Sequence, residues 1–244
     1  MLLYNLYNFM ENIDDLFKRV EEALETGSYV EALSLAEQAI IASVEQNLPD
    51  KCVNALGHKL IVYKHLFQQR EDLLYNELMY GDIQTGMAIC KQYNLFGQPL
   101  AVMLTRLGDY YVHKEQYMES VPHYEAAFME ISEASKGKFG ELAEYLSHLG
   151  LARVMAGQEQ GLKDVEQALA LANQDMELRA FHKLTITSGI LFRLAAIYGK
   201  RGDVVTFNQY FEKAMKEAEE LKSEYSMPMR IIQGERLKTK LGIV

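Results

Sequence analysis

A pattern of small and large apolar residues recurs along this chain at constant offsets, and an internal repeat constrains architecture more than any single motif. The clearest copy consists of Leu104, Leu107-Gly108, Tyr111, Ser120, Tyr124 and Ala127. Two more copies follow the same offsets, and a third is one residue shorter after the turn. The first two are Leu191, Leu194-Ala195, Tyr198, Phe207, Phe211 and Ala214; and Leu16, Val20, Ala23, Ala32, Ala36 and Ala39. The shorter one is Leu146, Leu149-Gly150, Gly161, Val165 and Ala168. Such a chain is expected to stack similar units, each of which buries its apolar face on its neighbours.

The offsets within each copy indicate two helices joined by a turn. The first four positions are spaced i, i+3, i+4 and i+7, which places them on one stripe of an α-helix. A small residue in the stripe, such as Gly108 or Gly150, allows a second helix to approach closely. Glycine stands between the two stripes at Gly27, Gly157 and Gly202. Because glycine adopts positive φ at little cost, these positions are expected to end the first helix of each pair.

The spacing Leu104-x2-Leu107-Gly108-x2-Tyr111, followed by Ser120-x3-Tyr124, resembles the tetratricopeptide repeat signature W-x2-L-G-x2-Y…A-x3-F…P. The chain departs from that family because it contains no tryptophan and the closing proline is missing. The resemblance implies an all-α fold, namely an α-α superhelix or solenoid of about five antiparallel helix pairs with a C-terminal capping helix.

The sequence predicts a helix for each half of every copy. The expected helices cover 12–26, 29–46, 50–80, 84–95, 98–115, 117–135, 139–157, 160–172, 176–201, 204–222 and 228–240. A weaker copy has its turn at Gly81-Asp82, 34 residues before the equivalent Glu115, and 34 is the family's repeat length. Residues 136–138 are expected to form a loop. We therefore expect an N-terminal extension over 1–11, a repeat domain over 12–225, and a capping helix with a tail over 226–244.

Composition narrows the classes of partner. A formal net charge of −9 and a pI near 5.3 argue against nucleic acid, which is bound through Lys and Arg aimed at phosphates. There is no run of about 18 apolar residues, so no membrane span is expected. Cys52 and Cys90 have no motif spacing and are expected to be reduced core thiols of a cytoplasmic protein. The stretch 230–240 is locally basic, either as a solvated helix face or as a docking patch for an acidic partner.

Sequence motifs for catalysis and cofactor binding are missing. The chain has no G-x-S-x-G elbow, no phosphate-binding G-x-x-x-x-G-K-[ST] loop and no G-x-G-x-x-G fingerprint. The six histidines are scattered without carboxylates at ligand spacing, so a metal site is not expected. We therefore expect no catalytic residues, no cofactor and no metal.

The resemblance also implies a binding face, because the first helices of such repeats line a concave groove. The positions that carry over are Val102, Thr105, Asp109, Val112 and His113; Glu144, Ser147, Leu151, Val154 and Met155; and Phe192, Ala196 and Lys200. A clamp for a C-terminal carboxylate is not expected, because Phe17 and Glu21 stand where the family's clamp needs Lys and Asn. The apolar residues around Leu151 either contact a partner peptide or pack against the neighbouring repeat.

The sequence predicts a protein- or peptide-binding adaptor or scaffold that uses the concave face of a helical repeat array. The alternative is a regulatory sensor, in which a short bound peptide changes the activity of a partner protein; region 1–80 would then be the place for an effector domain. An enzyme is the third hypothesis, and the missing motifs weigh against it. The expected partner is a protein or peptide, with a homodimer as one possible assembly.

Overall fold

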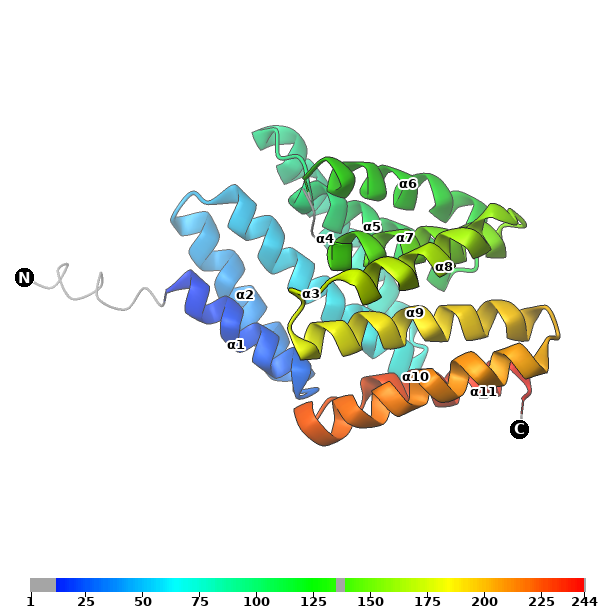
Figure 1. Ribbon diagram of the computed structural model, residues 1–244. Helices are drawn as coiled ribbons and strands as arrows, with labels where there is room; N and C mark the ends of the chain where they lie inside the picture. Colours follow the sequence, from blue (N-terminus) through cyan, green and yellow to red (C-terminus); the bar gives the residue numbers. More distant parts are fainter. Residues whose placement is uncertain (1–11, 135–138, 244) are drawn as a thin grey trace, which may run out of the picture. The chain divides into compact units, whose positions relative to one another are not determined.

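The computed structural model describes residues 12–134 and 139–243, and within them every regular element is an α-helix (Figure 1). The helices are α1 (Ile13–Glu25), α2 (Tyr29–Glu45), α3 (Pro49–Arg70), α4 (Leu73–Tyr93), α5 (Gln98–His113), α6 (Tyr117–Ala134), α7 (Phe139–Met155), α8 (Gln160–Gln174), α9 (Ala180–Lys200), α10 (Val204–Tyr225) and α11 (Met229–Leu241). The all-α prediction is confirmed for this part of the chain. The predicted extension over 1–11 and the predicted loop over 136–138 lie outside the described residues.

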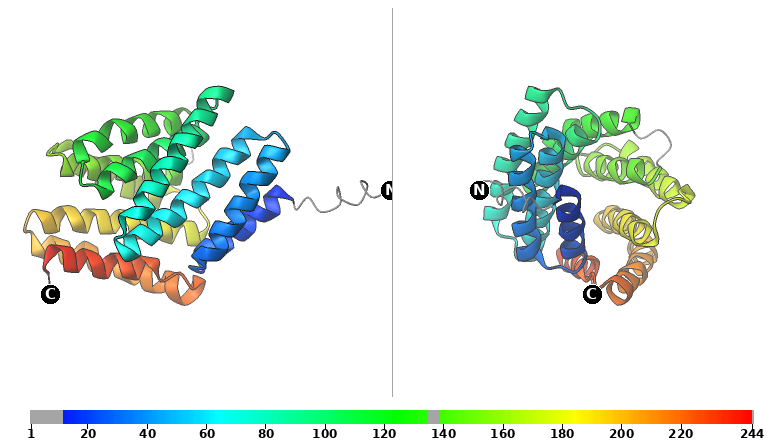
Figure 2. Two further views of the ribbon diagram at one scale, coloured as in Figure 1. Left: turned by 180° about the vertical axis from the view of Figure 1, so that it is seen from behind. Right: turned by 90° about the vertical axis from the view of Figure 1, so that its left-hand side faces the viewer.

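The helices group into two compact units that divide between Leu95 and Phe96. In the first unit, α1 packs on α2 and α3, α2 on α3, and α3 on α4, as neighbouring helices that alternate in direction (Figure 2). In the second unit, α5 to α10 form three successive pairs, with further contacts of α6 with α7, α8 with α9 and α7 with α9. The last helix, α11, packs on α9 and α10. The division between Leu95 and Phe96 lies within the stretch 12–225, for which one repeat domain remains the prediction.

The predicted repeat stripes form the cores of both units. Leu16, Val20, Ala32 and Ala36 are buried in the first unit, and the equivalent residues of the other copies are buried in the second. Those in the second unit are Leu104, Leu107, Tyr124, Ala127, Leu146, Leu149, Val165, Ala168, Leu191, Leu194, Ala195, Phe207, Phe211 and Ala214.

The small residue of the stripe is where the two helices of a pair meet. A Cβ atom added to Gly108 of α5 would lie 2.7 Å from the ring of Tyr124 on α6. A Cβ atom added to Gly150 of α7 would lie 2.6 Å from the carbonyl oxygen of Gly161 on α8. Both distances are shorter than a non-bonded carbon contact, so only glycine allows these approaches.

The turns between paired helices also follow the prediction. Gly27, Gly157 and Gly202 have φ values of 72°, 85° and 75°, which are left-handed conformations that glycine adopts readily. Glu115 occupies the same place in the α5–α6 pair with φ 58°.

The predicted boundaries between 50 and 95 are wrong. One helix over 50–80 and a short helix over 84–95 were expected, whereas α3 ends at Arg70 and α4 runs from Leu73 to Tyr93. The break occurs because Glu71 adopts φ 54° and the Asp72 side chain caps α4 by accepting a hydrogen bond from Leu74 N at 2.9 Å. Gly81, which was expected in a turn, lies inside α4.

Helix α11 covers the apolar face of the α9–α10 pair. Ile231, Leu237 and Leu241 pack against the core cluster that contains Phe207 and Phe211. These contacts are those required of a helix that closes the last pair of a stack.

Helix α9 is the one described helix that is long and apolar enough to cross a membrane by length and composition. Half of its apolar window is buried inside the protein, where Ile190, Leu194 and Ile197 belong to a core cluster with residues of α7 and α8. Its apolar character is therefore accounted for by packing within the second unit.

Candidate functional site

The residues predicted to line a groove are divided between the core and the surface. Thr105, Asp109, Ser147 and Phe192 are buried, whereas Glu144 and Lys200 are exposed. The others are partly buried: Val102, Val112, His113, Leu151, Val154, Met155 and Ala196.

The apolar strip around Leu151 packs within the protein. Leu151 and Val154 lie against the core cluster formed by α7, α8 and α9, and the Sδ atom of Met155 accepts a hydrogen bond from Lys200 Nζ at 3.4 Å. Phe192 is covered by α11, since a Cβ atom on Gly234 would lie 2.9 Å from its ring. These contacts favour the packing interpretation of Leu151 and Val154, and they place Phe192 in the core.

Asp109 lies at the centre of a polar cluster in the second unit. Its Oδ2 accepts a hydrogen bond from Arg106 Nη1 at 2.6 Å, and its Oδ1 accepts one from Tyr124 Oη at 2.8 Å. Nδ1 of His148 lies 3.5 Å from the same Oδ1 atom. The side chains of Arg106, Asp109 and His148 are only 11%, 4% and 8% exposed. Charged and polar groups so far from water require partners, and these three contact one another.

His148 connects this group to α9. Its Nε2 lies 2.5 Å from Nη2 of Arg193. A guanidinium can only donate, so Nε2 must be the acceptor and the imidazole is neutral, with its proton on Nδ1 facing Asp109. The Arg106, Asp109, His148 and Arg193 side chains therefore form a continuous chain of polar contacts across α5, α7 and α9.

A second guanidinium, from Arg230 of α11, lies beside that of Arg193. A Cβ atom on Gly189 would lie 3.0 Å from Nη2 of Arg230 and 3.2 Å from Nη1 of Arg193. Arg230 donates from Nη1 to Gln233 Oε1 at 2.6 Å and from Nη2 to the carbonyl oxygen of Thr185 at 2.8 Å. Glycine at position 189 thus leaves room for two cations side by side. We call Arg106, Asp109, Glu144, His148, Arg193 and Arg230 together the arginine cluster.

The electrostatics of the arginine cluster differ between its two ends. Burial lowers the pKa of Arg106, but the carboxylates of Asp109 and Glu144 more than offset it, and the pKa is raised overall. At the other end burial lowers the pKa of Arg193, and burial together with the charge of Arg193 lowers the pKa of Arg230 to about 10. At the end formed by α9 and α11, the negative charge of Glu144 acts on both arginines but does not offset the effect of burial.

The chemistry available to the arginine cluster is that of N–H donors and positive charge. A guanidinium binds oxyanions such as carboxylate or phosphate through paired hydrogen bonds. Across residues 12–134 and 139–243, no three His, Cys, Asp or Glu side chains are placed to share a metal ion. The cluster is therefore a candidate site for binding an anionic group.

Sequence reasoning placed Asp109 and Glu144 on this face but missed the arginines. A signal was present, because Arg106, His148 and Arg193 each follow the first leucine of their copy by two residues, as Lys18 does in the first copy. A basic or imidazole side chain therefore recurs at one repeat position, and in the second unit these positions come together.

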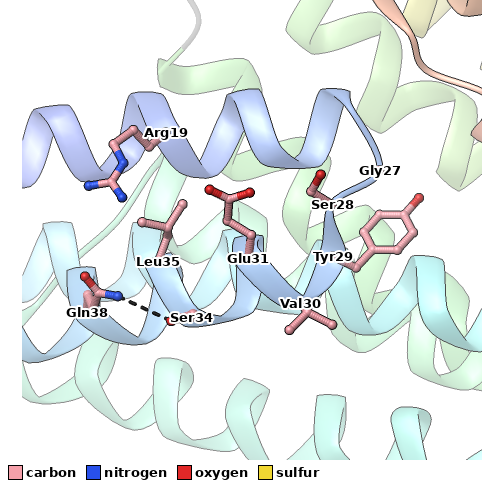
Figure 3. A pocket seen from close by; sticks show the side chains of 9 residues that line it. All are labelled: Arg19, Gly27, Ser28, Tyr29, Val30, Glu31, Ser34, Leu35 and Gln38. Atoms are coloured by element: carbon pink, nitrogen blue, oxygen red, sulfur yellow. Dashed lines mark hydrogen bonds between the residues drawn. The ribbon is translucent and has the colours of Figure 1, made fainter.

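A shallow pocket in the first unit is a weaker candidate (Figure 3). It lies at the start of α2 and is lined by Arg19, Gly27, Ser28, Tyr29, Val30, Glu31, Ser34, Leu35 and Gln38. Val30 is 85% exposed, and Gln38 Nε2 bonds Ser34 Oγ at 3.3 Å along the same helix. The pocket is open and is lined only by α1, the turn after it and α2, so it is the weaker candidate.

Comparison of the sequence with models of known protein families finds no match. Comparison with curated proteins finds no significantly similar sequence. The case for a function therefore depends on the geometry of the chain itself.

Proposed function

We propose that this protein is a protein- or peptide-binding adaptor built from helical repeats, and that the arginine cluster of the second unit lies on its binding face. The observation that carries the proposal is the recurrence of Arg106, His148 and Arg193 at one repeat position of three successive first helices. Packing alone favours apolar residues at half-buried positions, because an unpaired buried cation lowers stability. Polar side chains on successive helices, with N–H donors on the two arginines, instead suit an extended partner that crosses these helices.

The proposal includes the superhelical arrangement and the cytoplasmic location that the sequence predicts. The first is supported by the five helix pairs and the helix that covers the last of them. The second is supported by Cys52 and Cys90, which are both buried and are not joined in a disulfide. No reaction is assigned, since the arginine cluster contains neither a nucleophile beside a base nor a pair of carboxylates on the two sides of a substrate.

A peptide-display selection on the immobilised full chain tests this function. Selected peptides should bind in solution with a Kd below about 100 µM, well short of the 1 mM that marks about −4 kcal/mol. Arg193→Met removes the guanidinium and keeps its aliphatic stem, and it should raise the Kd at least tenfold. Arg179→Met is the matched control, because Arg179 is exposed and bonds only its neighbour His182 in the described part of the chain.

Two outcomes of that selection would count against the adaptor. The first is that no selected peptide binds measurably in solution. The second is that the two variants change the Kd equally, which would place binding away from the arginine cluster. Circular dichroism of each variant must show unchanged helicity for the comparison to hold.

The regulatory sensor is the second candidate, and the division into two compact units favours it. A sensor needs one part that binds the peptide and another that changes its interactions with a partner protein. The connecting segment holds Asn94 at φ 52° and Gly97 at φ 68°. If a selected peptide changes the rate of proteolytic cleavage between Tyr93 and Gln98, the sensor is supported; an unchanged rate favours the adaptor.

A further inference from the structure

The positive end of the arginine cluster has donors that its own residues do not use. Arg193 donates one hydrogen bond to the neutral imidazole of His148. Arg230 donates to the side-chain amide oxygen of Gln233 and to the backbone carbonyl of Thr185. Across the part of the chain that the structure describes, neither arginine is paired with a carboxylate. Nε of Arg230 is buried and donates to no acceptor there. A guanidinium has five N–H donors, so most of those on Arg193 are also unused.

Two guanidinium groups side by side repel each other, and the fold nevertheless makes room for both. Gly189 is the residue that allows it, because a methyl group there would lie 3.0 Å from Arg230 and 3.2 Å from Arg193. In addition, the two bonds of Arg230 to Thr185 and Gln233 hold its plane in one orientation. Two guanidinium groups held in a fixed geometry can both donate hydrogen bonds to the same oxyanion.

The charge balance of the arginine cluster selects the kind of anion. Its three arginines carry three positive charges, and Asp109 and Glu144 carry two negative charges, with His148 neutral. One further negative charge neutralises the cluster. A carboxylate supplies one, whereas a phosphate monoester supplies about −1.5 to −2 at neutral pH.

We propose that Arg193 of α9 and Arg230 of α11 together bind one carboxylate from an acidic side chain of a peptide partner. This inference rests on the proposed function and names the ligand class of the same site. Glu144, exposed at the same cluster, repels a second carboxylate and so limits the site to one. Because α9 and α11 each contribute one arginine, the bound carboxylate also joins the last helix to the preceding pair.

The direct test uses a blocked glutamate as the probe, namely N-acetyl-glutamate N-methylamide, added to the full chain labelled with ¹⁵N. The Nε–Hε signals of Arg193 and Arg230 should shift in a saturable way at constant ionic strength. The blocked glutamine, which has the same shape without the charge, should leave them in place. Arg179 provides an internal reference whose signal should not move with either probe.

Two variants separate a binding site from a screening effect. Arg230→Lys keeps the charge and loses the planar paired donors, so it should weaken the blocked glutamate at least tenfold. Gly189→Ala keeps both arginines but places a methyl group between them, and it should weaken the probe as well. This second variant keeps the proposal testable if Arg230→Lys does not fold.

The outcomes divide as follows. Equal shifts with glutamate and glutamine probes, or no saturable shift, would overturn the proposal. Tighter binding of inorganic phosphate than of the blocked glutamate would overturn the assignment to a carboxylate. If selected peptides bind but Arg230→Lys leaves their affinity unchanged, this inference fails and the adaptor function stands. If the blocked glutamate binds but no peptide does, the two arginines bind a carboxylate that is not part of a peptide partner, and both this inference and the adaptor function fail.

Discussion

At the scale of single residues, the closest contacts in this protein depend on glycine. The added Cβ at Gly108 would collide with the Tyr124 ring, and Tyr124 in turn bonds Asp109 of the arginine cluster. A change at Gly108 therefore affects both the α5–α6 contact and the position of a site carboxylate.

Gly108→Leu is expected to lower the free energy of unfolding by about 1–3 kcal/mol, because it overpacks the α5–α6 contact. Urea denaturation followed by circular dichroism measures the loss. Gly81→Ala is the matched control, because a Cβ there meets nothing within 4 Å, and it should stabilise α4 by about 0.5–1 kcal/mol. Equal stabilities for the wild type and Gly108→Leu would show that the alignment of this copy is wrong.

Asp175 gives a pH dependence of known sign. It accepts hydrogen bonds from Gly140 N at 2.8 Å and Glu177 N at 3.0 Å, and the first of these is the main reason why the pKa of Asp175 lies below 3.8. A depressed carboxyl pKa stabilises the fold above the unfolded-state pKa, and the contribution is lost as the pH falls through the folded-state value. Asp175→Ala should cost about 0.5–2 kcal/mol at pH 7, the range for a lost helix cap.

The difference between Asp175→Ala and the wild type should shrink when urea denaturation is repeated at pH 3. A difference that grows on acidification would contradict the assignment of this carboxylate. The loss of stability in Asp175→Ala can be compared with that in Asp203→Ala. Asp203 also caps a helix, because its Oδ1 accepts a hydrogen bond from Thr206 N of α10 at 3.0 Å.

Sequence reasoning succeeded for core residues and failed for the arginines for one physical reason. Core positions repeat because every helix pair must bury the same stripe, so periodicity identifies Leu104, Leu146 and Leu191 together. The arginine cluster depends on which helices come together, and Arg193 meets His148 from 45 residues away. Its partner Arg230 lies on a helix without a repeat copy, so no internal pattern marks it.

At the scale of elements, helix ends were predicted well at most turns and badly at the turn between α3 and α4. The ends near Gly27, Gly157 and Gly202 lie close to the predicted boundaries. The α3–α4 turn instead places Glu71 at φ 54°, a conformation that a side chain disfavours. No glycine marks that turn, and the residues on either side favour helix. The sequence therefore predicted one continuous helix over 50–80.

Glu71→Gly is therefore expected to raise the free energy of unfolding by about 1 kcal/mol, because it relieves the left-handed conformation. Gln84→Gly, on an exposed face of α4, should lower it by about 1 kcal/mol. Thermal unfolding of both variants measures the two effects. If both substitutions lower the free energy of unfolding equally, Glu71 is helical in solution, and the single helix predicted over 50–80 is correct.

Removal of α11 tests the closing of the last pair. Truncation before Ser226 uncovers Phe192 and Phe211, which α11 residues now pack against. The expected result is aggregation or dimerisation, seen as a larger mass in light scattering after gel filtration. A monomer as stable as the full chain would show that α11 is not a cap.

At the scale of the whole molecule, the sequence predicts about five helix pairs in one repeat domain, and the contacts group the helices into two compact units. The repeat period is similar on both sides of Leu95, so sequence similarity gives no boundary there. The two units are defined by which helices pack on one another, and that depends on tertiary packing rather than on the repeat pattern. The superhelical arrangement of the full array stays a prediction.

Each unit is expected to fold by itself, because each has its own core clusters. A fragment over 96–244 should show helical circular dichroism and a cooperative thermal transition, and it should retain peptide binding. A fragment over 12–95 should fold and bind none of the selected peptides. Failure of both fragments to fold would show that the division in contacts does not reflect independent stability.

The position of Arg230 has a consequence for protein synthesis. Because one of the two guanidinium groups comes from the last helix, a chain terminated early lacks half of the proposed site even if the preceding pairs have folded. Helix α11 also covers the apolar face of the α9–α10 pair. A chain without α11 would therefore expose apolar surface, tend to aggregate and fail to bind its partner. Ligand engagement would then report that the chain has been made through α11 and that α11 has packed on α9 and α10.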